Sequence, residues 1–299
     1  MHMHKWGSSG SHKTKPQLLS LNCIATHAIG VETFANQSGM TSREYEKSRF
    51  AVPHHILRSE VIYGEGFQSP GGIGAFQQIV LPQLSPSAGE RVLEIGSGLG
   101  GAAFHLVAQY EVEVVGVDTA ETMISIASDR RPRLDPSGRS RFVHGDVFLD
   151  ALKPASFDAI FCQDTLMYEA DKPTVLARCM ELLKPGGRLV INDFCEGQST
   201  LEFVKYAEVS GIYPVTIPVY ARMATSAGFV DVAARDISTE TVEHLRRDLH
   251  TYLERAEEDA KIDSADKEHV VDRWRRKIGL LEAGALAQGL IRASKSDKI

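Results

Sequence analysis

Short apolar runs rich in β-branched residues alternate with stretches of helical periodicity from residue 91 onward. The expected strands cover residues 91–95, 113–117, 141–144, 157–162 and 188–194. The expected helices between them cover residues 100–110, 120–130 and 173–183, and the Lys-Pro-Gly-Gly turn at 184–187 ends the last one. This alternation is typical of a parallel sheet with crossover helices.

The pattern loosens after residue 194. Helices are expected at residues 201–211 and 218–227, a sixth strand at 230–236 and a closing strand at 290–293. The long charged segment between the last two strands, about 241–289, has a helical pattern and is expected to form a lid. We therefore predict an α/β fold with a doubly wound, mostly parallel seven-stranded sheet and a helical lid.

These patterns divide the chain into three parts. Residues 1–41 are expected to be disordered or processed, residues 42–84 to form an N-terminal helical cover, and residues 85–299 to form the core and its lid. The stretch 13–31 contains no Asp or Glu, which suits an organelle transit segment, but it also lacks the arginines of such segments.

Composition narrows the class of partner. The formal net charge of -6 provides no basic field for nucleic acid or an anionic membrane, and no apolar run approaches the ~20 residues of a membrane span. We therefore expect a small-molecule partner, and the oligomeric state stays open. The four cysteines show no CxxC or metal-ligand spacing, so no metal site is expected. Three of them lie in apolar runs, which favours a reducing, cytoplasmic location.

A glycine-rich loop follows the first expected strand of the core. Gly96, Gly98 and Gly101 satisfy GxGxxG between a strand and a helix, where backbone N–H groups can face a ligand. Asp118 ends the next strand, 22 residues after Gly96, where a carboxylate can accept hydrogen bonds from ribose hydroxyls. These features suit a nicotinamide dinucleotide and S-adenosylmethionine equally.

Further segments separate these two nucleotides. Glu94 precedes the loop in Leu-Glu-Ile-Gly, Gly145-Asp146-Val147 follows the third strand, and Gln163-Asp164 follows the fourth. With the Lys-Pro-Gly-Gly turn, they resemble the successive motifs of class I S-adenosylmethionine-dependent methyltransferases over residues 91–194. The resemblance implies a Rossmann-like methyltransferase fold and S-adenosyl-L-methionine as the cofactor.

Two segments outside this core point to a narrower family. Residues 63–72 (YGEGFQSPGG) and 274–278 (WRRKI) are similar to segments of phosphoethanolamine methyltransferases, and order and spacing agree over residues 59–295. That resemblance implies N-methylation of a phosphoethanolamine-like amine. It implies cofactor contacts from Ser69, Gly96, Gly98, Asp118, Thr119, Asp146, Val147 and Gln163. It implies acceptor contacts from Tyr63, Asp164, Tyr213 and Lys277.

The chain departs from that family on the acceptor side. Tyr168 stands where the family has its catalytic histidine, and Phe50 or Ala51 where it has the partner tyrosine. Phe194 replaces a second tyrosine, and Gly211 replaces an arginine that grips phosphate. A single lysine supplies one positive charge and no paired N–H donors, which binds a phosphate dianion weakly.

These departures leave the acceptor open. We expect Tyr168 and Asp164 to carry the acceptor chemistry, with Tyr168 orienting the acceptor, since a phenol of pKa ~10 is a poor base. S-methylation of a thioether carboxylate to a sulfonium needs no base and is the main alternative. A nicotinamide-dependent oxidoreductase and a non-catalytic nucleotide sensor are two further hypotheses.

Overall fold

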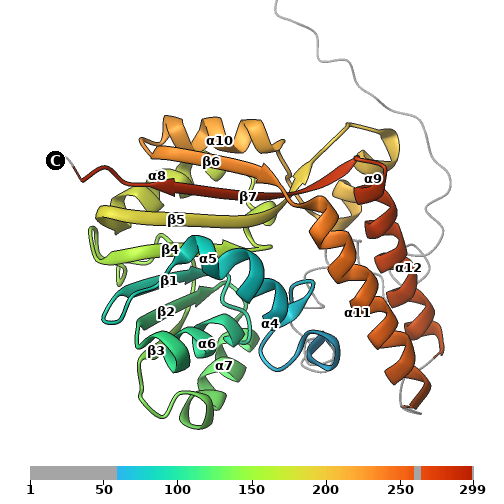
Figure 1. Cartoon of the computed structure of the whole chain (residues 1–299), viewed down its shortest axis with the longest axis horizontal. Helices are drawn as coiled ribbons and strands as arrows, with labels where there is room; N and C mark the ends of the chain where they lie inside the picture. Colours follow the sequence, from blue (N-terminus) through green and yellow to red (C-terminus); the bar gives the residue numbers. More distant parts are fainter. Residues whose placement is uncertain (1–58, 259–263, 298–299) are drawn as a thin grey trace, which may run out of the picture.

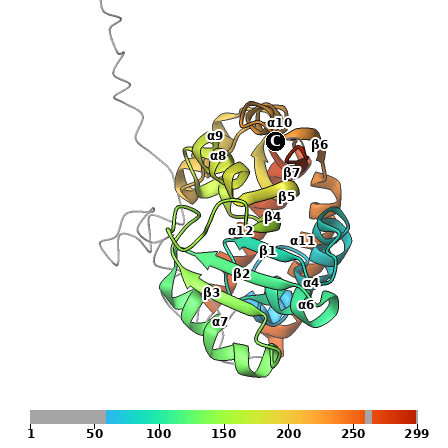
Figure 2. The same ribbon diagram turned by 90° about the vertical axis from the view of Figure 1, so that its left-hand side faces the viewer.

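The computed structural model describes residues 59–258 and 264–297, and its centre is a seven-stranded sheet. The strands are β1 (Arg91–Ile95), β2 (Glu113–Asp118), β3 (Ser140–His144), β4 (Phe157–Gln163), β5 (Leu183–Glu196), β6 (Val230–Asp236) and β7 (Leu286–Ser294). Their order is β3-β2-β1-β4-β5-β7-β6 (Figures 1 and 2), and β7 runs antiparallel to both of its neighbours. The predicted fold class is confirmed.

Helices connect and cover these strands. Before β1 lie α4 (Gly72–Ala75), η1 (Phe76–Val80) and α5 (Leu81–Leu84). Between the parallel strands lie α6 (Gly101–Tyr110), α7 (Glu121–Leu134), η2 (Leu166–Tyr168) and α8 (Lys172–Leu182). After β5 come α9 (Leu201–Ser210), α10 (Ile217–Ser226), α11 (Ser238–Glu258) and α12 (Ser264–Glu282). The first 58 residues, which contain the expected segment 1–41, Phe50 and Ala51, lie outside the described residues.

Alternation along the strands places a core on each face of the sheet. Leu93 and Ile160 pack with side chains of α8 and α10, whereas their neighbours Val92 and Phe161 pack with α6 and the helices before β1. Successive side chains of a strand point to opposite faces, so the near-continuous apolar strands fit a sheet covered on both sides. Each fully buried Leu or Phe contributes roughly 1.5–3 kcal/mol.

Two expected boundaries differ from the structure. The helical segment expected to reach residue 289 ends at Glu282, and β7 begins at Leu286, four residues before the expected strand. Gly284 (φ 67°) turns the chain there, and the N–H of Ala285 returns to the carbonyl of Leu280 at 2.9 Å. The Lys-Pro-Gly-Gly segment after α8 belongs to β5, because Leu183 already pairs with Phe157 of β4.

The segment expected to form a lid contains α11 and α12, which follow β6 and precede β7 in the chain and lie side by side (Figure 1), and we call this helix pair the lid. The sheet also contains a topological switch, since β1 is flanked by β2 on one side and by β4 on the other. Open α/β sheets bind ligands at the carboxyl ends of the strands beside such a switch. In Figure 1 the lid helices stand at this end of the sheet.

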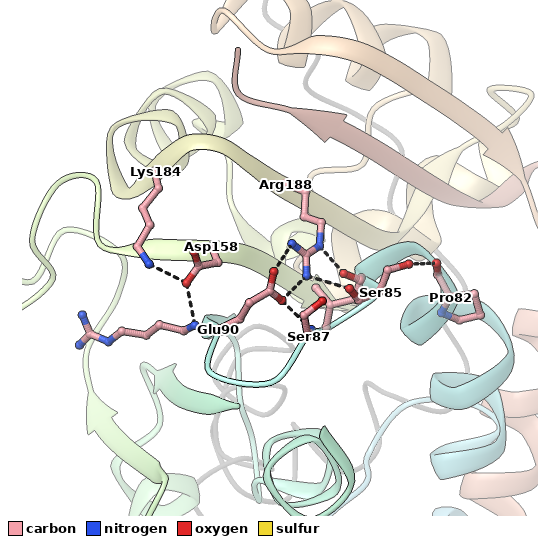
Figure 3. A network of polar contacts seen from close by, with 9 residues as sticks. Pro82, Ser85, Ser87, Glu90, Asp158, Lys184 and Arg188 are labelled. Atoms are coloured by element: carbon pink, nitrogen blue, oxygen red, sulfur yellow. Dashed lines mark hydrogen bonds and ion pairs between the residues drawn. The ribbon is translucent and has the colours of Figure 1, made fainter. Parts of the chain in front are cut away.

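The opposite end of the sheet is held by a polar network (Figure 3). Arg188 of β5 donates to both carboxylate oxygens of Glu90 and to the carbonyl of Ser85, which follows α5. Asp158 accepts from the N–H of Arg91 at 2.8 Å and from Lys184 Nζ at 2.7 Å. These contacts connect β1, β4 and β5 at their amino ends and leave the carboxyl ends to the site.

The cysteines and the helices were also the subject of expectations from the sequence. Cys162, Cys179 and Cys195 are buried free thiols. No helix within residues 59–258 and 264–297 is both long and apolar enough to cross a membrane.

Candidate active site

A cavity of about 990 Å³ lies at the carboxyl ends of β1, β2 and β4 and extends to the lid. The structure brings every residue of the sequence-predicted site to its wall. Those residues are Tyr63, Ser69, Gly96, Gly98, Asp118, Thr119, Asp146, Val147, Gln163, Asp164, Tyr168, Tyr213 and Lys277. Segments from Ser59 to Lys277 meet here, so the site depends on the whole core and lid.

The glycine loop after β1 is in close contact with two other segments. Gly96 has φ 73°, and a Cβ there would lie 2.1 Å from Thr165 Oγ1. A Cβ on Gly98, which has φ 51°, would lie 2.9 Å from Oε1 of Gln68. The positive φ favours glycine at both positions, and the close Thr165 side chain requires it at Gly96, so the loop presents bare backbone.

Asp118, at the end of β2, is hydrogen-bonded to this loop. Its Oδ2 accepts from the N–H of Gly98 and its Oδ1 from the N–H of Ala120, each at 2.9 Å. Burial raises the pKa of this carboxyl, although both hydrogen bonds act in the other direction. Each carboxylate oxygen can accept a further bond, so Asp118 can receive two hydroxyl groups from a ligand.

Glu94 is a buried carboxyl at the start of the loop and lines the cavity. Burial and then the charge of Asp118 raise its pKa well above the ordinary value. Its Oε2 has no hydrogen-bond partner among the described residues. A buried oxygen in this position favours a ligand that brings a donor or a positive charge.

Asp146 and its neighbours after β3 form another part of the cavity wall. Asp146 follows β3, and its Oδ1 accepts from the N–H of Phe148 at 2.9 Å. The turn places Asp146 and Val147 on the cavity wall together with Phe148, an exposed aromatic side chain. The arrangement offers a carboxylate and an apolar surface to a planar ring.

Asp164 directly follows β4 and lines the cavity. Its backbone is left-handed (φ 51°), and its N–H donates to the carbonyl of Asn192 at 2.8 Å. Its Oδ1 accepts from Nε2 of Gln288 at 3.0 Å, and the carboxylate also receives a hydrogen bond from Ser69. Burial raises its pKa, whereas Gln288 and the charge of Lys277 lower it. Left-handed aspartates are uncommon and concentrate at functional sites.

Two buried ionisable side chains, Lys172 and Asp193, lie behind the segment that carries Tyr168. Lys172 is 1% exposed and Asp193 is fully buried, and each influences the other's pKa. Burial lowers the pKa of Lys172 and raises that of Asp193. Lys172 Nζ donates to the carbonyls of Glu169 and Tyr213, and the Asp193 carboxylate receives the N–H of Met167. The Lys172 bonds, together with the bond from the N–H of Tyr213 to the carbonyl of Met167 at 2.7 Å, hold η2, which carries Tyr168, next to Tyr213.

Aromatic side chains form the lid wall of the cavity. The ring of Trp274 on α12 lies 6.0 Å from that of Tyr63 and 5.6 Å from that of Tyr252, centroid to centroid. Lys277 Nζ lies 4.3 Å from the centre of the Phe194 ring, within cation–π range. Burial, followed by the charge of Asp248, raises the pKa of Tyr63, so its hydroxyl stays protonated.

The lid also contacts the loop at residues 69–72. The N–H of Gly71 donates to Oδ2 of Asp248 on α11 at 2.8 Å, and a Cβ on Gly71 would lie 2.4 Å from Nδ1 of His244. Burial raises the pKa of Asp248 to about 6. The loop that brings Ser69 to Asp164 is therefore held from the lid side as well.

Sequence reasoning missed several of these residues. Gln288, Lys172, Asp193 and Asp248 act through contacts between distant segments, and no motif marks them. Arg273 lines the cavity one helical turn before Lys277. The basic run that contains it was visible, but the sequence did not show which of its members face the cavity.

A family model described as a methyltransferase domain matches residues 86–257 of this chain. Phosphoethanolamine N-methyltransferase 1 of Arabidopsis thaliana is 31% identical over 244 residues, which cover 81% of this chain and 49% of that protein. The phosphoethanolamine N-methyltransferase of Plasmodium falciparum is 28% identical and is covered over 90% of its length. The chain spans about half the length of the curated plant relatives it matches.

Among solved structures, the chain is similar to phosphoethanolamine N-methyltransferase 2 of Haemonchus contortus. That structure contains phosphomonomethylethanolamine and S-adenosylhomocysteine. The TM-score is 0.77 at 23% identity, covering 90% of this chain and 61% of the other. At that identity the likeness concerns the fold.

Proposed function

The chain belongs to the methyltransferase-domain family, and from this premise we propose that it methylates the amine of a phosphoethanolamine-like acceptor with S-adenosylmethionine as the donor. One observation carries the proposal. A single cavity contains a nucleotide-type half, with its glycine loop and Asp118, and an aromatic half with basic side chains, and Asp164 on its wall is hydrogen-bonded to Ser69 and feels the charge of Lys277. The names of the relatives agree with this assignment.

The residues of the first half fit S-adenosylmethionine. The bare backbone at Gly96 and Gly98 admits close approach, and the oxygens of Asp118 suit the ribose hydroxyls. The unsatisfied Oε2 of Glu94 suits the amino group of the methionine end. Thr119 and Gln163 complete the assigned cofactor wall, and Asp146 with Val147 forms its adenine end. When bound, this cofactor supplies an electrophilic methyl group on a sulfonium.

In the aromatic half, the carboxylate of Asp164 binds the ammonium group of the acceptor and takes a proton from it. Burial raises the pKa of its carboxyl, which makes it a stronger base than an exposed aspartate. Tyr168 and Tyr213 flank the amine and exclude water, and Lys277 holds the acidic group at the other end of the acceptor. Positioning of the nitrogen supplies much of the rate in such a displacement.

A thioether acceptor is a second candidate, and one observation favours it. No histidine among the described residues lines the cavity. A thioether has no proton to lose, so it would need neither a histidine nor Asp164 as a base. Asp164 and the aromatic rings would then stabilise the positive charge of the sulfonium product.

An acceptor screen that measures S-adenosylhomocysteine release tests the proposal. The acceptors are phosphoethanolamine, its mono- and dimethyl forms, glycine derivatives and methylthio-carboxylic acids. Turnover of the phosphorylated amines alone is the expected result. Turnover of methylthio acids alone would replace the proposal with the thioether function, and Tyr168→Phe should then cost little activity. A response to nicotinamide dinucleotides but not to S-adenosylhomocysteine would reject both functions.

A further inference from the structure

Helix α12 carries a run of basic residues that the structure separates into two groups. Arg273 and Lys277 line the cavity. Arg275, which is exposed like Arg273, does not line it, and the guanidinium of Arg276 lies 5.6 Å from the centre of the Tyr206 ring. Residues four apart share one face of a helix, which explains why Arg273 and Lys277 face the same space.

These two are the basic side chains of the cavity wall within the described residues. The remaining charged groups there are carboxylates, namely Glu94, Asp118, Glu121, Asp146, Asp164 and Glu169. An anionic part of a ligand would be repelled over most of this wall. The lid face of α12 is the place where it can be accepted.

The surroundings place this basic face on the acceptor side. Lys277 lies against Phe194 and acts on Asp164, and the charge of Arg273 acts on Tyr63. Gly211 also lines the cavity, and a Cβ there would meet nothing within 4 Å. That position leaves room for an acceptor but offers it no charge.

We propose that Arg273 is a specificity-determining residue and forms, with Lys277, a two-cation subsite for the phosphomonoester of the acceptor. The inference rests on the proposed function. A guanidinium presents paired N–H donors that match a phosphate, and the lysine adds a point charge. The two positive charges match the phosphate dianion, whose second pKa is about 6. The charge missing at Gly211 is thus supplied from the lid, and the amine end remains at Asp164.

The test compares the full-length wild-type chain with Arg273→Ala, Arg273→Lys and the matched control Arg275→Ala. S-adenosylhomocysteine release is measured with phosphoethanolamine and with ethanolamine, which has the same amine and no phosphate. Arg273→Ala should raise KM for phosphoethanolamine roughly ten- to a hundredfold, the usual effect of losing charged hydrogen bonds, with a much smaller change in kcat. Arg273→Lys should lie between wild type and Arg273→Ala.

The kinetics of Arg275→Ala with phosphoethanolamine should stay close to wild type, and the Arg273 variants should leave any rate with ethanolamine, however low, at the wild-type level. Equal effects of Arg273→Ala and Arg275→Ala, or equal effects on both acceptors, would overturn the proposal. Melting curves and the affinity for S-adenosylhomocysteine verify that each variant folds. If Arg273→Ala does not fold, Arg273→Gln is used in its place.

A binding experiment separates this inference from the proposed function. If wild type methylates no phosphorylated amine, the proposed function fails, and the subsite is then judged by calorimetric titration with inorganic phosphate in the presence of S-adenosylhomocysteine. Wild type should bind phosphate at least about tenfold more tightly than Arg273→Ala. No binding by wild type, or equal binding by both proteins, would reject the subsite.

Discussion

Nε2 of Gln288 donates a hydrogen bond to Oδ1 of Asp164 at 3.0 Å, across 124 residues of sequence. The same nitrogen donates to Oδ1 of Asn192 on β5 at 2.6 Å. The antiparallel strand β7 therefore supports the carboxylate that we assign to the acceptor amine. The two residues are coupled through the ionisation of Asp164, which Gln288 favours.

Replacing Gln288 with leucine should shift the pH dependence of activity. Burial raises the pKa of Asp164 and the Gln288 hydrogen bond lowers it, so losing that bond raises the pKa further. If the ionised form is active, the acid limb of the kcat/KM profile moves to higher pH. At neutral pH, kcat/KM should fall about tenfold, which corresponds to one hydrogen bond to a charged group. The exposed change Gln198→Leu is the control, and an unmoved acid limb would contradict the coupling.

Asp118→Ala should weaken cofactor binding. The variant loses the carboxylate to which we assign two ribose hydroxyls, and it releases the N–H of Gly98 that shapes the glycine loop. We expect the Kd for S-adenosylhomocysteine to rise roughly ten- to a hundredfold by calorimetry. Asp129→Ala, on the exposed side of α7, should leave the Kd unchanged. Equal affinity of Asp118→Ala and wild type would remove the ribose assignment.

Asp248→Asn should stabilise the protein above pH 6. Burial raises the pKa of Asp248 to about 6, so the folded state binds its proton more tightly than the unfolded chain does. The contribution is complete below the unfolded pKa of about 3.9 and is lost as pH rises to about 6. An asparagine carbonyl can still accept from Gly71 and carries no buried charge.

Calorimetry from pH 4 to pH 8 measures the effect of this change. The Tm of Asp248→Asn should match wild type near pH 4 and exceed it by a few degrees near pH 8, since 1 kcal/mol shifts Tm by about 2–4 °C in a protein of this size. Asp272→Asn, an exposed change on α12, should follow the wild-type curve. A constant Tm difference across the pH range would exclude titration of Asp248 as the cause.

Lys172→Met should destabilise the fold and loosen the acceptor pocket. The variant removes the charge that acts on buried Asp193 and leaves the carbonyls of Glu169 and Tyr213 without their hydrogen bonds from Lys172. Each buried group left unsatisfied costs about 1–3 kcal/mol, and urea denaturation would measure the loss. The exposed change Lys205→Met is the control. Adding Asp193→Leu to Lys172→Met should restore part of the stability, and further loss in the double variant would argue against the coupling of the two residues.

The sheet was predictable because each of its first five strands has a recognisable local sequence pattern. Each apolar run between 91 and 194 is bounded by polar or glycine residues, and buried parallel strands need little else. The boundary between α12 and β7 was not predictable. Leu286 to Gln288 continue a helical pattern, and β7 takes its length from pairing with nine residues of β5. Tertiary pairing decided that boundary.

The site divides in the same way. The cofactor-side residues follow strands at motif spacing, so sequence predicted which would share a wall. Lys172 in an Asp-Lys-Pro helix start has the pattern of a solvated residue, yet it is buried, and its ammonium donates to the carbonyls of Glu169 and Tyr213. Arg273 could not be told from Arg275 without the direction of the helix face. Pairings between distant segments leave no local pattern.

The position of β7 bears on how the protein is made. It is the last described element of the chain, yet it lies inside the sheet between β5 and β6. Among the described strands, β6 pairs only with β7, so β6 can join the sheet only after β7 has been made. A nascent chain can pair β1 to β4 before β7 is made, but Asp164 gains Gln288 only after residue 288 has been added. The acceptor side of the site is therefore completed later in synthesis than the glycine loop and Asp118.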